Sequence, residues 1–545
     1  LLHPIFAPRQ ARLNHSLTQN PFGGNVREMK TLRTDCLVIG AGLAGVAYAL
    51  HAARAGLKVA LVSRGGKFDA NSDRAQGGII YDTEGASGLL AKDIMEASAG
   101  TANPAAIAHL VENGPSAIEE LLMGEHPVEF DHKPDGTLEF TREGGHSARR
   151  IIHAQDRTGH AILKSVARQV SEEPNITRYA GATAIDLLTL SHSAEGAENR
   201  YAPLTAYGAW ILLPDATDPV PFLAKKTILA TGGLGQIYQH TTNTRGAVGH
   251  GVSMAYRVGA RVIDMEYVQF HPTVFYGKKA PRFLITEAIR GEGAVLVNAA
   301  GEHFMEEVHR RGSLAPRDIV SRAIHRELTD SGESCVFLDL DAMDRGKLKE
   351  RFPTVYTSCL QQGVDITTDP IPVVPAAHYS CGGIHADMAG RTNIRHLNAI
   401  GETGSTGLHG ANRLASTSLL ECLTGGKAAA LKDIEEIGSM EFRLPEPRPW
   451  KSPEYEADPT LIAQDLNMVQ QTMWNYAGIV RTPRRLTRAR RILLESREEI
   501  QSFYRNCRVT PELVELRNAV QTALLVVRAA TLNQRSRGAH FVVDE

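Results

Sequence analysis

The sequence lacks an excess of charge of either sign, a long apolar run and any closely spaced pair of cysteines. Its 59 basic and 61 acidic residues nearly balance, so charge indicates neither a nucleic-acid nor a membrane-surface partner. No apolar run approaches the roughly 18 residues that a membrane-spanning helix needs. The six cysteines are scattered, without a C-x-x-C pair, which is typical of reduced cysteines. We therefore expect a cytoplasmic protein with no membrane or nucleic-acid partner and no metal site.

A glycine-rich turn at residues 40–45 lies between a predicted strand at 36–40 and a predicted helix at 46–55, and a second strand follows at 58–62. This order is that of a dinucleotide-binding fingerprint, whose glycines allow a tight turn, close approach of a pyrophosphate and close helix–strand packing. The acidic residue that usually binds the ribose after the second strand is missing, because Ser63 and Arg64 stand there. This absence argues against plain NAD binding. The structural alternative is a tight turn in an ordinary α/β domain.

The chain of 545 residues is too long for one core, so we expect two to four domains. Hydrophobic periodicity and capping residues predict a helix at 103–123, a helix at 151–167 with His153 and Asp156, strands at 201–214 and 225–230, a helix ending at 259, a strand and turn at 397–402 and a helix at 416–431. A proline-rich linker at 444–449 precedes three predicted amphipathic helices at 461–476, 483–504 and 510–532.

The first residues have an unusual composition. Residues 1–27 contain three arginines and no acidic residue, which an organellar transit peptide would permit. The other interpretation is an upstream extension, because residues 29–36 lead into the first strand as a natural start would. We favour Met29 as the functional start, and on either interpretation we expect residues 1–30 to be flexible and outside the fold.

A series of ordered motifs makes the chain resemble the flavoprotein family of succinate dehydrogenase, fumarate reductase and L-aspartate oxidase. The motifs are residues 40–45, 75–78, 230–233, 269–273, 286–293, 315–318, 378–383, 401–402, 409–413 and 418–421. The resemblance implies an α/β fold with a Rossmann-like FAD-binding domain at 31–266 and 379–443. It also implies an inserted α+β capping domain at 267–378 and a C-terminal three-helix bundle at 444–545.

Within the family, residues 142–146, 473–481 and 536–540 are similar to motifs of the L-aspartate oxidase branch. Family members in membrane complexes attach FAD covalently through a histidine five places before the Gln of Gln-Gly-Gly. Asn71 occupies that place here, so the resemblance implies non-covalent FAD. The expected FAD contacts are Gly40, Gly42, Leu43, Ala44, Gly45, Ser63, Arg64, Asn71, Ser72, Gln76, Gly77, Gly78, Ala230, Thr231, Gly232, Glu402, Ser418 and Leu419.

The resemblance also assigns roles in a site for a C4 dicarboxylate. His378 and Arg413 would bind one carboxylate, and His271 and Thr286 the other. Arg317 would donate or accept a proton, with Glu287 and Arg290 as its relay, and Glu143 would contact the substrate. Taken singly, each residue has a structural alternative: a hydrogen-bonded histidine, a helix cap, a salt-bridge partner or a solvated loop acid.

The implied reaction is FAD-dependent oxidation of L-aspartate to iminoaspartate, with oxygen or fumarate as electron acceptor. By the same resemblance, the imine would pass to quinolinate synthase as the first step of de novo NAD biosynthesis. Two alternatives stay open: a soluble fumarate reductase or succinate-oxidising flavoprotein, and a catalytically silent flavin-binding protein.

Two positions depart from the family pattern. His250 stands where the family has the aspartate of Gly-Asp-Gly, and Thr417 stands where it has an asparagine. A histidine can donate a hydrogen bond but brings no carboxylate, so we expect FAD affinity or flavin potential to be affected.

Overall fold

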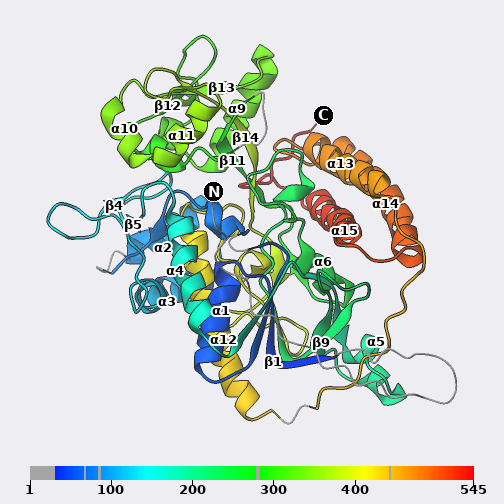
Figure 1. Cartoon of the computed structure of the whole chain (residues 1–545). Coiled ribbons are helices and arrows are strands. Elements are labelled where there is room, and N and C mark those ends of the chain that lie inside the picture. Colours follow the sequence, from blue (N-terminus) through cyan, green and yellow to red (C-terminus); the bar gives the residue numbers. More distant parts are fainter. Residues whose placement is uncertain (1–30, 67–68, 84–86, 278–282, 441–442, 545) are drawn as a thin grey trace, which may run out of the picture.

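The computed structural model describes residues 31–66, 69–83, 87–277, 283–440 and 443–544. The predicted N-terminal extension, with both interpretations of it, lies outside these residues. Figure 1 shows a sheet flanked by helices, a smaller region above it, and a group of C-terminal helices beside both. Among the described residues, no helix combines the length and apolar character needed to span a bilayer.

The main sheet has seven strands in the order β6-β2-β1-β9-β8-β7, with β16 also pairing with β9. The strands are β1 (Leu32–Ile39), β2 (Val59–Ser63), β6 (Ile176–Ala180), β7 (Thr183–Thr189), β8 (Ala206–Leu212), β9 (Val220–Leu229) and β16 (Leu397–Ala399). β1 is parallel to β2 and β9, whereas β8 is antiparallel to both β7 and β9. The predicted Rossmann-like α/β fold is confirmed.

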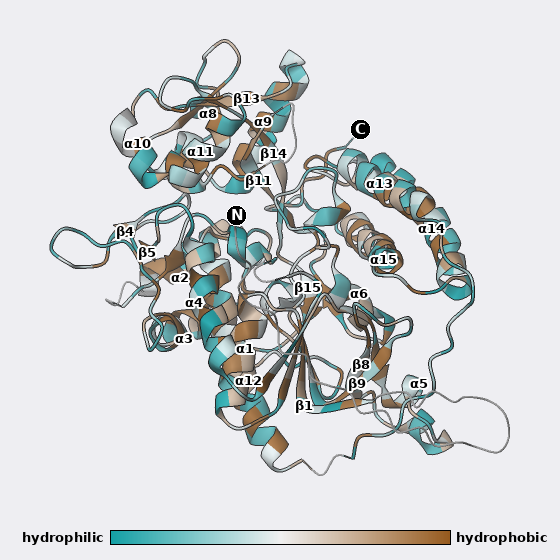
Figure 2. Ribbon diagram, in the orientation of Figure 1, coloured by the Kyte–Doolittle hydropathy of each residue, from teal (hydrophilic) through white to brown (hydrophobic). Residues whose placement is uncertain are grey.

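Successive residues of β1 enter different cores on the two faces of this sheet. Cys36 and Val38 pack among the helices of one face, which are α1 (Leu43–Arg54), α3 (Pro104–Leu122), α4 (Thr158–Glu172) and α12 (Thr417–Gly438). Leu37 and Ile39 pack on the other face with α6 (His250–Arg257) and the C-terminal helices. Because both faces are covered, β1 is a continuous apolar run and not an alternating one. Figure 2 shows these hydrophobic strands between the two layers of helices.

A second, antiparallel sheet lies above the first and has its own core. Its strands, in spatial order, are β11 (Val268–Phe275), β14 (Ile371–Ser380), β13 (Val336–Asp339) and β12 (Val295–Val297). Its helices are α7 (Glu287–Gly291), α8 (Met305–Val308), α9 (Arg317–Ser331), α10 (Arg345–Arg351) and α11 (Pro353–Gln361). This region is the predicted α+β insertion, whereas its expected limits at 267 and 378 stay a prediction.

Three long helices form the C-terminal region as predicted: α13 (Pro459–Tyr476), α14 (Pro483–Asn506) and α15 (Pro511–Leu532). Each begins with the same local signal. Asp458, Thr482 and Thr510 accept a backbone N–H at the helix start, and a proline follows each of them at the first helical position. α15 is buried along much of its length and packs against α6 in the main core.

The predicted helix at 151–167 is wrong at its start. Residues 151–152 form β5 (Ile151–Ile152), which pairs with β3 (Ile79–Ile80) and β4 (Phe140–Thr141). Gln155 has a left-handed backbone with φ 50°, and α4 begins only at Thr158. Asp156 instead accepts the backbone N–H of Val355 at 2.9 Å. Pairing and capping by distant segments override the local helical pattern here.

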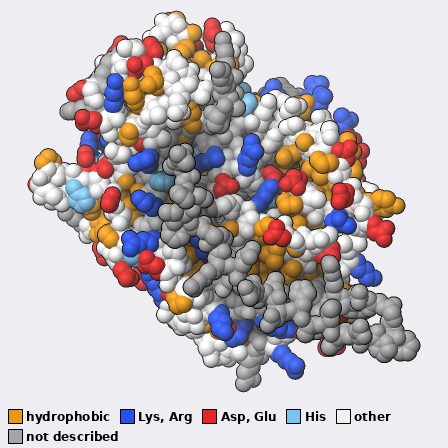
Figure 3. All heavy atoms as spheres, viewed as in Figure 1, with side chains coloured by type: hydrophobic (Ala, Val, Ile, Leu, Met, Phe, Trp, Pro, Cys, Tyr) orange, Lys and Arg blue, Asp and Glu red, His pale blue; other side chains and the backbone are white. Residues whose placement is uncertain are grey.

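The other local predictions are confirmed with shifted ends. Asn103 caps α3 by accepting the Ala105 N–H at 3.1 Å, as its position before a proline predicts. The predicted strand at 201–214 is shorter, because it begins at Ala206. The remaining elements are α2 (Ser87–Ala97), α5 (Leu190–Ser193), β10 (Val262–Ile263), β15 (Gly383–His385) and β17 (Gly404–Ser405). Figure 3 shows basic and acidic side chains interspersed on one face, as the balanced composition predicts.

Candidate active site

One cavity of about 910 Å³ brings together almost all of the predicted site residues. It is lined by the carboxyl ends of β1 and β2, by the turn after β9, and by residues of the second sheet. Ligands of open α/β sheets bind at this edge of the strands. Of the predicted FAD contacts all but Gly45 line the cavity, and of the predicted substrate and proton-transfer residues all but Arg290 do.

The glycine-rich turn has the geometry that a bound pyrophosphate requires. Gly40 has φ 118°, and an added Cβ would lie 2.1 Å from the carbonyl oxygen of Ala230. A Cβ on Gly45 would lie 2.0 Å from the Gly40 carbonyl oxygen, which explains why Gly45 is small although it does not line the cavity. Gly42 begins α1 without a side-chain cap, and a Cβ added to it would make only ordinary van der Waals contacts, the nearest 3.7 Å from Ser72 Oγ. This helix start can therefore bind phosphate oxygens, and the residues present fit FAD.

Asn71 and Thr417 can be placed directly. Asn71 lines the cavity and its Oδ1 accepts the Thr244 N–H at 2.8 Å, so the amide is held by a hydrogen bond. Thr417, one of the two departures from the family, is buried at the start of α12 and donates to the Leu414 carbonyl at 2.7 Å. Thr417 does not line the cavity, so the threonine hydroxyl bonds a backbone carbonyl and does not contribute to the cavity wall.

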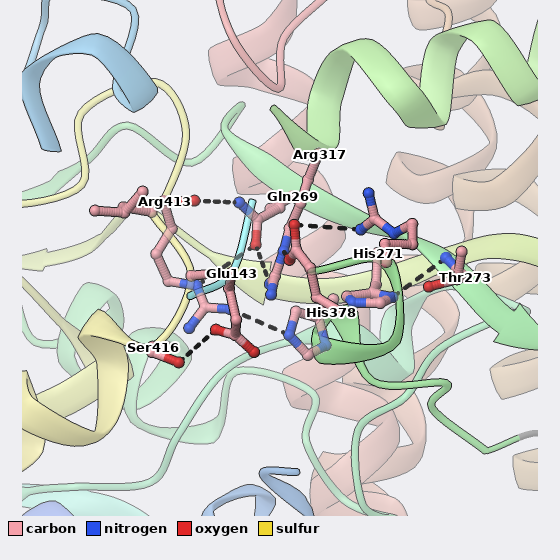
Figure 4. A network of polar contacts seen from close by, with 12 residues as sticks. Glu143, Gln269, His271, Thr273, Arg317, His378, Arg413 and Ser416 are labelled. Atoms are coloured by element: carbon pink, nitrogen blue, oxygen red, sulfur yellow. Dashed lines mark hydrogen bonds and ion pairs between the residues drawn. The ribbon is translucent and has the colours of Figure 1, made fainter. Parts of the chain in front are cut away.

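At the other end, side chains from several segments far apart in the sequence converge, as Figure 4 shows. His271 comes from β11, His378 from β14, and Arg317 from the first turn of α9. Thr286 caps α7 by accepting the Ala288 N–H at 3.3 Å, which places Glu287 in the first turn. Glu143 and Arg413 lie in loops.

Arg317 is held by an acid and an amide. Its Nε donates to Glu287 Oε2 at 2.6 Å, and its Nη1 donates to Gln269 Oε1 at 3.1 Å. Arg290 lies behind Glu287, with Nη2 3.2 Å from Oε1. Burial alone would raise the pKa of Glu287, but the guanidinium groups of Arg317 and Arg290 outweigh it and the pKa is lowered. The predicted order of Arg317, Glu287 and Arg290 is therefore present as a chain of contacts, although Arg290 does not reach the cavity.

Both histidines of the site are neutral. Burial, followed by the charge of Arg317, lowers the pKa of His271 and His378 well below the usual value. His271 accepts the Thr273 N–H at Nδ1 (3.2 Å), so its proton is on Nε2. His378 Nε2 lies 3.2 Å from Arg413 Nη2 and must accept, which leaves Nδ1–H to donate to Thr242 Oγ1 at 2.8 Å. His378 and Arg413 are thus adjacent, with both ring nitrogens of His378 already hydrogen-bonded, and their shared role in binding a carboxylate stays a prediction.

Glu143 is a second buried carboxylate in the same cavity. Ser416 donates its hydroxyl to Glu143 Oε2. Burial, and then the charge of Glu287, raise the pKa of Glu143 above the usual carboxyl value. Two glycines make room for these acids: a Cβ on Gly77 would lie 1.8 Å from Glu143 Oε1, and a Cβ on Gly144 would lie 2.3 Å from Glu287 Oε1.

Gln269 is a site residue that the sequence prediction missed. It is fully buried, and its Oε1 accepts from Arg317 and from Arg413 Nε at 3.4 Å. Its Nε2 donates to the Arg413 carbonyl at 2.8 Å, which fixes the amide orientation. The signal was present, because Gln269 is two residues before His271 on a strand, where alternate side chains share a face. The ring of Tyr379, 4.5 Å from the Arg413 guanidinium, was missed as well.

Comparisons with known proteins identify the family. The FAD binding domain model matches residues 35–419, and the Fumarate reductase flavoprotein C-term model matches residues 466–545. L-aspartate oxidase 1 of Ralstonia nicotianae is 44% identical over 94% of this chain and 95% of its own length. The chloroplastic L-aspartate oxidase of Arabidopsis thaliana is 37% identical over 97% of this chain and 84% of its own.

A solved structure of a mutant E. coli quinol fumarate reductase FrdA superposes with a TM-score of 0.84 at 27% identity, covering 95% of this chain and 92% of that one. A structure of Mycobacterium smegmatis Sdh1 gives 0.77 at 27% identity, covering 94% and 89%. The predicted family resemblance is confirmed. The chain belongs to the FAD-binding flavoprotein family that contains the L-aspartate oxidases and the fumarate reductase flavoproteins.

Proposed function

We propose that this chain oxidises L-aspartate to iminoaspartate, using non-covalently bound FAD and either oxygen or fumarate as the electron acceptor. Relatives named L-aspartate oxidase that align over nearly the whole chain support the reaction class. The observation that carries the choice of substrate is Glu143, a buried carboxylate in the same cavity as Arg317 and Arg413. The arginines suit any C4 dicarboxylate, whereas the extra carboxylate suits a substrate that also has an ammonium group.

The cationic and donor groups divide between the two carboxylates of the substrate. Arg413, oriented by Gln269 and adjacent to His378, would bind one of them. His271 would donate Nε2–H to the other, with the Thr286 hydroxyl as a second donor. These groups are buried and already hydrogen-bonded, so little ordering is needed when the substrate binds.

Glu143 would pair with the substrate ammonium. The approach of that cation favours the ionised carboxylate, offsetting the burial that raises the pKa of Glu143. FAD, when bound, supplies the two-electron acceptor for the Cα–H bond. Arg317 would hold or move the proton that the substrate amino group loses. Glu287, which accepts from Arg317 Nε, fixes the direction of the guanidinium.

The pathway position and compartment are part of the same proposal. Iminoaspartate is unstable in water, so an enzyme that consumes it, quinolinate synthase in NAD biosynthesis, is the expected partner. All six cysteines are free, which suits a reducing compartment such as the cytoplasm. We also propose that residues 267–378 act as one capping domain over the substrate end.

One anaerobic experiment separates this proposal from its main alternative. The purified holoprotein is mixed with L-aspartate, succinate or fumarate, and the flavin absorbance is followed. Bleaching by L-aspartate, with recovery on adding fumarate or oxygen, is the expected result. Bleaching by succinate alone would support a fumarate reductase or succinate-oxidising flavoprotein, which the likeness to the solved FrdA structure favours. No bleaching by either dicarboxylate would support a silent flavin-binding protein.

A further inference from the structure

His250 and Arg64 lie together at the end of the cavity that the carboxyl end of β2 and the start of α6 form. Arg64 follows β2, at the position where dinucleotide-binding folds contact the adenosine ribose. His250 begins α6 and replaces the family's aspartate; it lines the same cavity, with Nε2 3.4 Å from Arg64 Nη1. The hydrogen bonds around His250 decide which of its two ring nitrogens, Nδ1 or Nε2, carries the proton.

The neighbouring helix α15 decides the tautomer of His250. Asn518 is completely buried, and its Oδ1 accepts from Arg257 Nη1 at 2.7 Å. A guanidinium has no acceptor, so the amide cannot be turned the other way. The NH₂ group of Asn518 must then face His250, and it donates to Nδ1 at 2.8 Å. Nδ1 is an acceptor, and the ring proton is therefore on Nε2.

His250 stays neutral with this tautomer. Burial, followed by the charges of Arg64 and Arg257, lowers the pKa of His250 to about 3. The other terminal nitrogen of Arg64, Nη2, pairs with Glu515 of α15. With this tautomer, Arg64 Nη1, which can only donate, lies 3.4 Å from a ring nitrogen that is also a donor, and among the described residues His250 Nε2–H has no acceptor. A donor at this position requires an acceptor atom on the ligand. An aspartate at the same position would instead accept a hydrogen bond from the ligand.

We propose that His250 donates Nε2–H to an acceptor oxygen in the adenosine half of FAD, and that Asn518 and Glu515 of α15 are positioning residues for this donor pair. The C-terminal helical region is then part of the cofactor site. The inference depends on FAD binding and not on the identity of the substrate, so it survives if the proposed reaction is wrong.

The first test uses two amides at position 250, with the full-length apoprotein titrated with FAD by flavin fluorescence quenching. His250→Gln places an NH₂ near the position of Nε2, whereas His250→Asn reaches only as far as Nδ1. We expect His250→Asn to weaken FAD binding up to about tenfold, as for one neutral hydrogen bond, and His250→Gln to change it less than about threefold. Equal losses in both variants would overturn the donor role.

A ligand control locates the contact. FMN lacks the adenosine half, so neither variant should change its Kd by more than about twofold. An equal loss for FMN and FAD would overturn the placement. If flavin resists removal, the midpoint of thermal flavin release from the holoprotein is measured in its place, and it should fall for His250→Asn but not for His250→Gln.

The positioning role of Asn518 has its own test. Asn518→Ala frees the ring to change tautomer, so it should weaken FAD binding about as much as His250→Asn does. In a His250→Gln background the donor no longer depends on a ring tautomer, and Asn518→Ala should then cost less than about twofold. A purely structural role for Asn518 would give the same loss in both backgrounds, and that result would overturn the proposal. ¹⁵N-histidine NMR should additionally show Nε2–H for His250 in the wild-type protein.

Discussion

The charged groups at the two ends of the cavity have different kinds of partner. At the substrate end, Glu287 pairs with both Arg317 and Arg290, and Gln269 joins Arg317 to Arg413. At the end formed by β2 and α6, the adenosine end, Arg64 and His250 line the cavity, contact each other, and are held from α15 by Glu515 and Asn518. The substrate end is therefore ordered by its own contacts, whereas the adenosine end depends on a helix from the far end of the sequence.

This difference separates substrate chemistry from cofactor affinity. Changes at the substrate end should alter turnover and leave flavin binding intact, because the side chains there are not among the expected FAD contacts. Changes at the adenosine end should alter flavin affinity and leave the choice of substrate intact.

The largest effect expected is complete release of flavin. Asn71 presents an amide held by the Thr244 N–H, and an amide cannot link to the flavin. Acid or heat precipitation of the holoprotein should therefore leave all of the yellow colour in the supernatant, measured by absorbance. Colour that stays with the denatured chain would mean that a covalent bond forms through another residue.

Arg317→Leu should abolish most of the turnover. Loss of a general acid typically costs about 10²–10⁴-fold, so fumarate reduction by the reduced protein should fall by that much or more, with FAD still bound. Stopped-flow flavin reoxidation by fumarate measures it. Arg310→Leu, at an exposed position in the same region, is the matched control. If Arg317→Leu keeps more than about a third of the wild-type rate, the proton comes from another group.

Glu143→Gln should change the choice between dicarboxylates. A hydrogen bond to a charged group contributes about 1.5–3 kcal/mol, so kcat/KM for L-aspartate should fall at least about tenfold. Fumarate reduction, which involves no ammonium group, should change less than about threefold. Glu139→Gln, at an exposed position nearby in the chain, serves as the control. Equal losses for both substrates would show that Glu143 only supports the structure.

The raised pKa of Glu143 predicts a pH profile. Burial and the charge of Glu287 favour the protonated form of Glu143. As the pH drops through the raised pKa of Glu143, which lies above the usual carboxyl value of about 4.3, kcat/KM for L-aspartate should therefore fall. His271 and His378, whose pKa values are lowered, should not contribute near their usual range. Steady-state kinetics across pH would show this acidic limb in the wild type and its loss in Glu143→Gln. An unchanged limb in that variant would assign it to another group.

The smallest effect is expected at the adenosine end. Arg64 is partly exposed, and exposed ion pairs contribute about 0–1 kcal/mol, so Glu515→Gln should weaken FAD binding by no more than about fivefold. KM for L-aspartate should not change when flavin is saturating. Glu512→Gln, exposed on the same helix, should leave both unchanged. A change in KM without a change in FAD affinity would contradict the separation of the two ends.

Elements with local signals could be predicted from the sequence alone. The turn at 40–45, the cap at Asn103 and the starts of the three C-terminal helices depend on residues within a few positions of one another. The turn and the cap were predicted, and the helix starts, expected at 461, 483 and 510, were found at 459, 483 and 511. The motifs also supplied the residues that meet at the substrate end. Their roles as substrate and proton-transfer groups stay predictions.

Conformations and contacts that depend on distant residues became visible only in the folded structure. Residues 151–156 have a helical pattern, but a strand pairing and a cap on α11 from remote segments give them another conformation. Gln269 became a site residue because two arginines, one from α9 and one from a loop, converge on its oxygen. The proton on His250 is placed by Asn518, whose own orientation is fixed by Arg257. Hydrogen bonds between residues that are 48 to 268 positions apart leave no periodic pattern in a sequence, and so they are visible only in the folded structure.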